Sequence, residues 1–215
     1  MNSLRLYWSP AFSEHEVGPG HPESPARIKA VRSRLEAKGL WDQCTPEEAR
    51  AATREELLPV HPAGYLQRVE QAARGRPGPF DSPDTVISPG SWPAALKVAG
   101  AGFQAVNAVL EGNVNAAFIL GRPPGHHALP ERAMGFCFLA NAALAAEHAR
   151  HRHGLERIAI IDWDVHHGNG TQEIFYNNEN VYYISMHEWP LFPGTGAADE
   201  KGSGRGQGFT LNFPL

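Results

Sequence analysis

The strongest constraint on this chain is the alternation of short apolar runs with stretches of helical periodicity. The runs that predict strands lie at 4–8, 116–120, 157–161, 181–186 and 209–213. Apolar residues at helical spacing, with capping and glycine signals, predict helices near 25–39, 62–73, 92–110 and 141–153. This alternation predicts an α/β fold with a mainly parallel sheet, and the proline-rich stretch 77–91 is predicted to be a loop.

The predicted strand 116–120 is a continuous apolar run, as in strands buried on both faces of a parallel sheet, and 157–161 is predicted to be another buried strand. Ligands of such sheets bind at the carboxyl ends of the strands. We therefore expect the chemistry directly after Leu120, Ile161 and Met186.

Composition excludes several classes of protein. The 215 residues carry 19 Lys and Arg against 23 Asp and Glu, and a net charge of −4 argues against a nucleic-acid binder. Two cysteines, Cys44 and Cys137, cannot form a disulfide framework. No apolar run approaches the ~20 residues of a membrane-spanning helix. We expect a cytoplasmic protein without a membrane partner.

Polar side chains follow the strand that ends at Ile161. Asp162, Asp164 and His166 alternate along an extended segment and should point the same way. Carboxylate oxygen and imidazole nitrogen both suit Zn²⁺, so Asp164 and His166 are predicted ligands, with Asp162 orienting its neighbours. The alternative is a surface turn, but two buried like charges without a cation would cost several kcal/mol.

Two adjacent histidines, His126 and His127, follow the strand that ends at Leu120. On a loop stiffened by proline and glycine they could act as general base and acid, and the alternative is an incidental exposed pair. Three other histidines, His148, His151 and His153, lie at a polar helix end and are expected to be solvated.

Aromatic residues flank the same loops, in the stretches 134–138 and 189–196. They could wall a narrow apolar channel, although core packing is the commoner fate of phenylalanine. Cys137 lies among them with no obvious base nearby and is expected to be a small buried hydrophobe.

These segments together resemble the histone deacetylase family, which includes acetylpolyamine amidohydrolases and bacterial deacetylase-like amidohydrolases. The resemblance runs from about His21 to Leu215 and is specific, because the segments occur in the family's order. The matching segments are His21-Pro22-Glu23, 122–128, 135–137, 162–171 and 192–196. It implies an arginase-like α/β fold with a parallel sheet flanked by helices.

The resemblance implies that His126 and His127 are tandem catalytic histidines and that Asp164 and His166 bind Zn²⁺, with Fe²⁺ as an alternative. The implied reaction is hydrolysis of an acetyl-amide in a small-molecule or peptide substrate, by a metal-activated water. The residues that resemble the structural K⁺ site are Asp162 and Ser185. Those that resemble the substrate tunnel and its rim are Phe136, Phe192, Gly135 and Asp84.

Two departures from the family pattern affect these expectations. Asn169 stands where many members have an aspartate that pairs with the second histidine, which favours the class II and bacterial branch. The family's third metal ligand and its Gly-Gly-Tyr segment would lie after Leu215. The chain is therefore expected to be the N-terminal portion, 1–215, of a single domain whose last strands are absent.

Three functions stay open at this point. The leading one is a zinc-dependent deacetylase or amidohydrolase, and a relative of the same class would prefer acetylpolyamines. The alternative is a non-catalytic fragment that binds acyl-lysine or serves as a scaffold, because two protein ligands are few for catalytic zinc. A homo-oligomer is possible.

Overall fold

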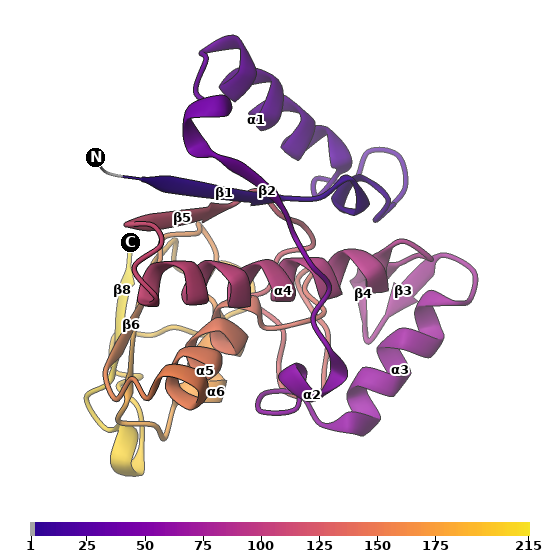
Figure 1. The fold of residues 1–215 in the computed structure, drawn as a ribbon. Helices are drawn as coiled ribbons and strands as arrows, with labels where there is room; N and C mark the ends of the chain where they lie inside the picture. The colour runs from indigo at the N-terminus through magenta and orange to yellow at the C-terminus, as the bar shows by residue number, and fades with distance from the viewer. Residues whose placement is uncertain (1–2) are drawn as a thin grey trace.

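A computed structural model describes residues 3–215, and its order of elements confirms the predicted α/β fold (Figure 1). The strands are β1 (Leu4–Trp8), β2 (Pro46–Glu48), β3 (Gly78–Phe80), β4 (Ser82–Ile87), β5 (Ala116–Ile119), β6 (Ile158–Asp162), β7 (Val181–His187) and β8 (Thr210–Pro214). The α-helices are α1 (Pro25–Ala37), α2 (Arg54–Leu57), α3 (Ala63–Ala73), α4 (Ser91–Leu110), α5 (Asn141–His153) and α6 (Asn169–Phe175). Short 3₁₀ helices are η1 (Pro10–Ser13), η2 (Asp42–Cys44) and η3 (Gly204–Gly206).

The strands form two parallel sheets and one antiparallel hairpin. One sheet has the order β2-β1-β5 and the other the order β6-β7-β8, with all neighbours parallel. In the second sheet Asp162 is in register with Ser185. The predicted parallel pairing is therefore confirmed, and both sheets place polar residues at their carboxyl ends.

Helix α4 lies between the first sheet and helices α3 and α5 (Figure 1). Its alanines contribute to two core clusters, one against β1 and η1 and one against α3 and α5. Of its large apolar residues, Phe103 is fully buried but Leu110 is 40% exposed. Small side chains make up most of the buried face, because neighbouring elements lie on more than one side of the helix.

The prediction that 77–91 is a loop is wrong, because β3 and β4 form a hairpin there. Pro79 and Pro83 obscure the strands in the sequence. A two-stranded hairpin tolerates them because a strand with one neighbour uses only part of its backbone N–H groups in pairing. Asp81 adopts a positive φ of 58° at the turn.

The prediction that both apolar runs are fully buried is also wrong. β5 and β6 are edge strands, and Phe118 and Ile161 are 46% and 54% exposed. On the β6-β7-β8 sheet, Met186 and Phe213 share the exposed face with Ile161, as their register shows. We call Ile161, Met186 and Phe213 the open sheet face.

Two further findings concern the helices. His148 and His153 are not free in solvent, because both ring Nε2 atoms contact Asn107 of α4. Across residues 3–215, no helix combines the length and the apolar character that crossing a membrane requires.

Candidate active site

The loops after β5, β6 and β7 meet around a cleft of about 460 Å³. The structure places in this cleft the two adjacent histidines, the two predicted metal ligands and both predicted tunnel walls. The predicted residues that line it are His126, His127, Asp164, His166, Gly135, Phe136, Phe192 and Asp84. Asp162 and Asn169 do not line this cleft but contact His126 and His127, which do, and Ser185 lies beside Asp162.

His126 is oriented by Asp162 at the end of β6. Its Nδ1 donates a hydrogen bond of 2.9 Å to Asp162 Oδ2, because an ionised carboxylate can only accept. Burial would raise the pKa of Asp162, but hydrogen bonds from His126, the Asp164 backbone and Tyr183 lower it below its usual value. Nε2 of His126 is left available to the cleft.

His127 is oriented by Asn169 at the start of α6. Its Nδ1 donates to Asn169 Oδ1 at 2.9 Å, while the Asn169 amide nitrogen donates to Met134 Sδ. Burial, and next the charge of His126, lower the pKa of His127 to about 4. The ring is therefore neutral at pH 7, with its proton on Nδ1 and an unprotonated Nε2.

Asp164 and His166 form a pair suited to a metal ion. Asp164 Oδ1 lies 3.1 Å from His166 Nδ1. Two donors that bind one ion at about 2.0–2.1 Å are about 3 Å apart, so the spacing fits a shared cation. Within residues 3–215, no group of three His, Cys, Asp or Glu side chains is placed to hold a metal ion.

Ser185 lies beside Asp162 on the neighbouring strand. The Ser185 side chain is buried, and its hydroxyl donates to His187 Nδ1 at 2.8 Å because His187 Nε2 donates to the Gly196 carbonyl. A carboxylate and a hydroxyl oxygen side by side are the donor types that hard cations prefer.

The predicted tunnel walls depend on close backbone contacts. Phe192 packs edge-on against His127, with ring centroids 5.1 Å apart. Gly135 has a positive φ of 54°, and a Cβ there would lie 2.2 Å from His127 Cδ2. Phe136 follows with a positive φ of 69°, which is unusual for an aromatic residue. Glycine at 135 is therefore required for the wall to lie against His127.

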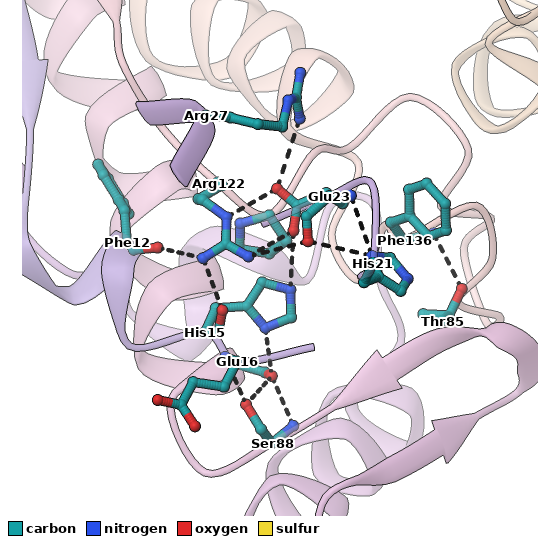
Figure 2. Close-up of polar contacts among 12 residues, drawn as sticks. Phe12, His15, Glu16, His21, Glu23, Arg27, Thr85, Ser88, Arg122 and Phe136 are labelled. Carbon is teal, nitrogen blue, oxygen red and sulfur yellow. Dashed lines mark hydrogen bonds and ion pairs between the residues drawn. The ribbon is translucent and has the colours of Figure 1, made fainter. Parts of the chain in front are cut away.

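A buried ion pair anchors the loop that carries the two histidines (Figure 2). Arg122, 1% exposed, makes a bidentate contact with Glu23, at 2.8 Å to Oε1 and 2.7 Å to Oε2. Its Nη1 also donates to the carbonyls of Phe12 and His15 at 2.6 and 2.7 Å. The burial of His15, and next the charge of Arg122, lower the pKa of His15 to about 4.

Two further residues connect this anchor to the tunnel wall. His21 packs edge-on against Phe136 at 4.6 Å, accepts from the Glu23 N–H at Nδ1 and donates from Nε2 to the Asp84 carbonyl at 3.2 Å. The Phe136 N–H donates to Thr85 Oγ1 at 3.1 Å, as Figure 2 shows. The sequence assigned these residues no role, although His21, Glu23 and Arg122 lie in segments that resemble the family. Their role depends on contacts between distant parts of the chain.

Comparison with known proteins finds a family match and several relatives. Residues 21–215 match the family model described as "Histone deacetylase domain". A Pseudomonas aeruginosa protein named histone deacetylase-like amidohydrolase is 47% identical over 91% of this chain and 52% of its own length. Human polyamine deacetylase HDAC10 is 40% identical over 100% of this chain and 32% of its own. The crystal structure of the HDA15 HD domain superposes with a TM-score of 0.94 at 40% identity, covering 99% of this chain and 62% of that one. The chain spans about half the length of the first two curated relatives it matches.

Proposed function

Because the chain belongs to the histone deacetylase family, we propose that it supplies the cleft and the histidine pair of a zinc-dependent hydrolase of N-acetylated amines. The observation that carries the proposal is the convergence of His126, His127, Asp164 and His166 on one cleft. The cleft also has two aromatic walls, which suit the flat, narrow chain of an acetyl-lysine side chain.

Asp164 and His166 would hold Zn²⁺, or Fe²⁺ in its place, and the bound ion would polarise the amide carbonyl and lower the pKa of a water molecule. His127 would accept a proton from that water at Nε2, the nitrogen that Asn169 leaves free. The imidazolium formed would donate the proton to the leaving amine. His126 would be held in its orientation by the hydrogen bond to the ionised Asp162.

Asp162 and Ser185 would hold the structural K⁺ that the family resemblance implies. Their place next to each other on β6 and β7 supports this assignment. The substrate could be a peptide acetyl-lysine or an acetylpolyamine, since one relative is named a polyamine deacetylase. Asp84 at the cleft would bind a substrate N–H or an ammonium group.

A second candidate function is supported by the donor set. Among the described residues, no third His, Cys, Asp or Glu joins Asp164 and His166. The 215-residue chain could therefore bind an acyl-lysine side chain without hydrolysing it.

One experiment separates the two functions. The purified chain is loaded with Zn²⁺, its metal content is measured, and a fluorogenic acetyl-lysine peptide is supplied. Hydrolysis that a chelator abolishes, and that His127→Ala lowers by about 10²–10⁴-fold, supports the enzyme. His151→Ala, on the exposed end of α5, is the matched control and should leave turnover unchanged. Peptide binding without turnover supports the binding fragment. If the chain binds no zinc and shows no turnover, that result contradicts the enzyme proposal for this chain.

A further inference from the structure

The wall residue Phe192 lies in a segment that has no regular structure of its own. Within the described chain, residues 188–203, between β7 and η3, contain no helix or strand. Phe192 packs edge-on against the rings of His127 and His166, at 5.1 and 6.2 Å between centroids, yet it remains 42% exposed. Its own packing is therefore partial, and its place beside the two histidines depends on what holds the segment.

On the C-terminal side of Phe192, the segment is attached at Gly196. The Gly196 N–H lies 3.1 Å from each oxygen of the Glu200 carboxylate, and the Gly196 carbonyl accepts from His187 Nε2 at 3.0 Å. Gly196 has a positive φ of 95°, and a Cβ there would lie 2.5 Å from His187 Nε2 and 2.6 Å from His167 Cγ. Glycine is therefore required for the backbone to lie this close to the two rings.

The Glu200 carboxylate is the centre of this attachment. Besides the Gly196 N–H, it accepts hydrogen bonds from the Ala197 N–H at 3.1 Å and from Gln172 Nε2 at 2.5 Å. Burial would raise the pKa of Glu200, but the hydrogen bonds from Gln172 and the two backbone N–H groups lower it below its usual value. Both oxygens thus accept hydrogen bonds, which an ionised carboxylate can provide and an amide cannot.

Gln172 of α6 links Glu200 to the buried part of the molecule. Gln172 is 7% exposed, and its Oε1 accepts from His167 Nε2 at 3.0 Å and from Asn212 Nδ2 of β8 at 2.7 Å. The other nitrogen of the His167 ring, Nδ1, lies 2.8 Å from Thr195 Oγ1 in the same segment. Two series of hydrogen bonds that meet at Gln172 therefore fasten the segment to α6 and β8.

We propose that Glu200 is a positioning residue of the cleft, which holds Phe192 against His127 through Gly196 and so sets how tightly the cleft binds an acylated side chain. The proposal rests on the proposed function, because it takes Phe192 as a wall of the substrate tunnel. Glu200 does not line the cleft, so it acts only through the segment that carries Phe192. The alternative is a role confined to the local turn, in which the Glu200 N–H donates to the Ala197 carbonyl.

Exchanging Glu200 and its partner Gln172 provides the test. Glu200→Gln replaces one acceptor oxygen with an NH₂ group, so one N–H donor loses its partner. The double variant Glu200→Gln/Gln172→Glu keeps the composition and restores the contact, because the new amide at position 200 donates to the new carboxylate at position 172. That carboxylate still accepts from His167 and Asn212. Asp199→Asn, at the exposed neighbouring position, removes one charge outside these contacts and is the matched control.

Three measurements are made on the full chain, with circular dichroism to confirm that each variant is folded. Hydrogen exchange at the Gly196 and Ala197 N–H groups should become about 10–100-fold faster in Glu200→Gln, because a charged acceptor is lost. The NMR signals of the His127 ring should move toward those of a Phe192→Ala variant, which has no wall. A fluorescently labelled acetyl-lysine peptide should bind about tenfold less tightly, as expected for a wall that is in place about a tenth of the time.

The double variant should restore all three measurements, and Asp199→Asn should change none of them. Wild-type His127 signals in Glu200→Gln, equal effects in Asp199→Asn, or no recovery in the double variant would overturn the proposal. A wild-type chain that binds no peptide contradicts the proposed function instead. The His127 signals and the exchange rates then decide by themselves whether Glu200 positions Phe192.

Discussion

At the scale of single residues, two adjacent histidines in the cleft differ in the charge of their hydrogen-bond partners. Asp162 is a charged partner for His126, whereas Asn169 gives His127 a neutral one. The sequence predicted both histidines and both partners, because they lie in short segments that follow strands. It could not predict that burial lowers the pKa of His127 to about 4, because burial depends on elements far along the chain.

Asn169→Asp tests this division of charge. A carboxylate within hydrogen-bonding distance of His127 Nδ1 should raise the pKa of that ring by about 1–3 units. The measurement is an NMR titration of the His127 ring signals in both proteins. Asn169→Gln, which adds no charge, serves as the control, and an equal pKa in the aspartate variant would contradict the assigned contact.

Thr85→Val tests how the tunnel wall is held. It removes the acceptor of the Phe136 N–H while keeping the shape of the side chain, and an unsatisfied buried N–H costs about 1–3 kcal/mol. Urea unfolding should show a loss of that size, with faster hydrogen exchange at Phe136. Thr85→Ser keeps the hydroxyl and should retain most of the protection. Unchanged exchange in the valine variant would mean that Thr85 does not position the wall.

At the scale of elements, the sequence predicted the longer helices and five of the six strands in the two parallel sheets to within a few residues, but it missed β2. It missed the β3–β4 hairpin, because prolines mark turns and edge strands alike. It also assigned full burial to β5 and β6, because an apolar run shows the preference of a strand for burial and not whether a neighbour covers it.

One buried histidine that hydrogen-bonds to distant segments should make the stability of the fold sensitive to acid. His61, fully buried after α2, donates from Nδ1 to the Pro130 carbonyl and accepts from the Ala140 N–H at Nε2. Burial lowers the pKa of His61 to about 4, against about 6.5 in an unfolded chain. The unfolded state therefore binds more protons between these values. The stability that the neutral His61 ring contributes is fully present above about pH 6.5. This contribution falls by about 3 kcal/mol as the pH drops to 4.

His61→Gln should reduce this acid loss, because an amide can donate and accept without titrating. The free energy of unfolding in urea, measured at pH 7 and at pH 4.5, gives the slope for each protein. His151→Gln changes an exposed ring and should keep the wild-type slope. If His61→Gln loses as much stability as the wild type, another buried histidine is responsible.

At the scale of the whole molecule, the open sheet face exposes apolar side chains that a parallel sheet normally buries. Parallel sheets are normally covered on both faces, yet Ile161, Met186 and Phe213 are each at least 40% exposed. Exposed apolar patches of this kind drive association. We expect the 215-residue chain to self-associate as its concentration rises.

The double variant Ile161→Lys/Phe213→Lys should shift the chain toward the monomer, because burying lysine in an interface is costly. Light scattering after size-exclusion chromatography, over a range of concentrations, measures the effect. Gln207→Lys adds charge at an exposed polar position and should leave the association as it is. A monomer at all concentrations in the wild type would contradict the role of this face.

The Glu23–Arg122 ion pair also determines where this protein can be shortened. The family match begins at residue 21, which invites an expression boundary there. Such a cut would remove the carbonyls of Phe12 and His15, which accept hydrogen bonds from the Arg122 guanidinium. A cut after Glu23 would also leave a buried cation without its counter-charge, at a cost of about 3–5 kcal/mol. The smallest unit that keeps its histidine loop in place therefore starts well before residue 21, where the family match begins.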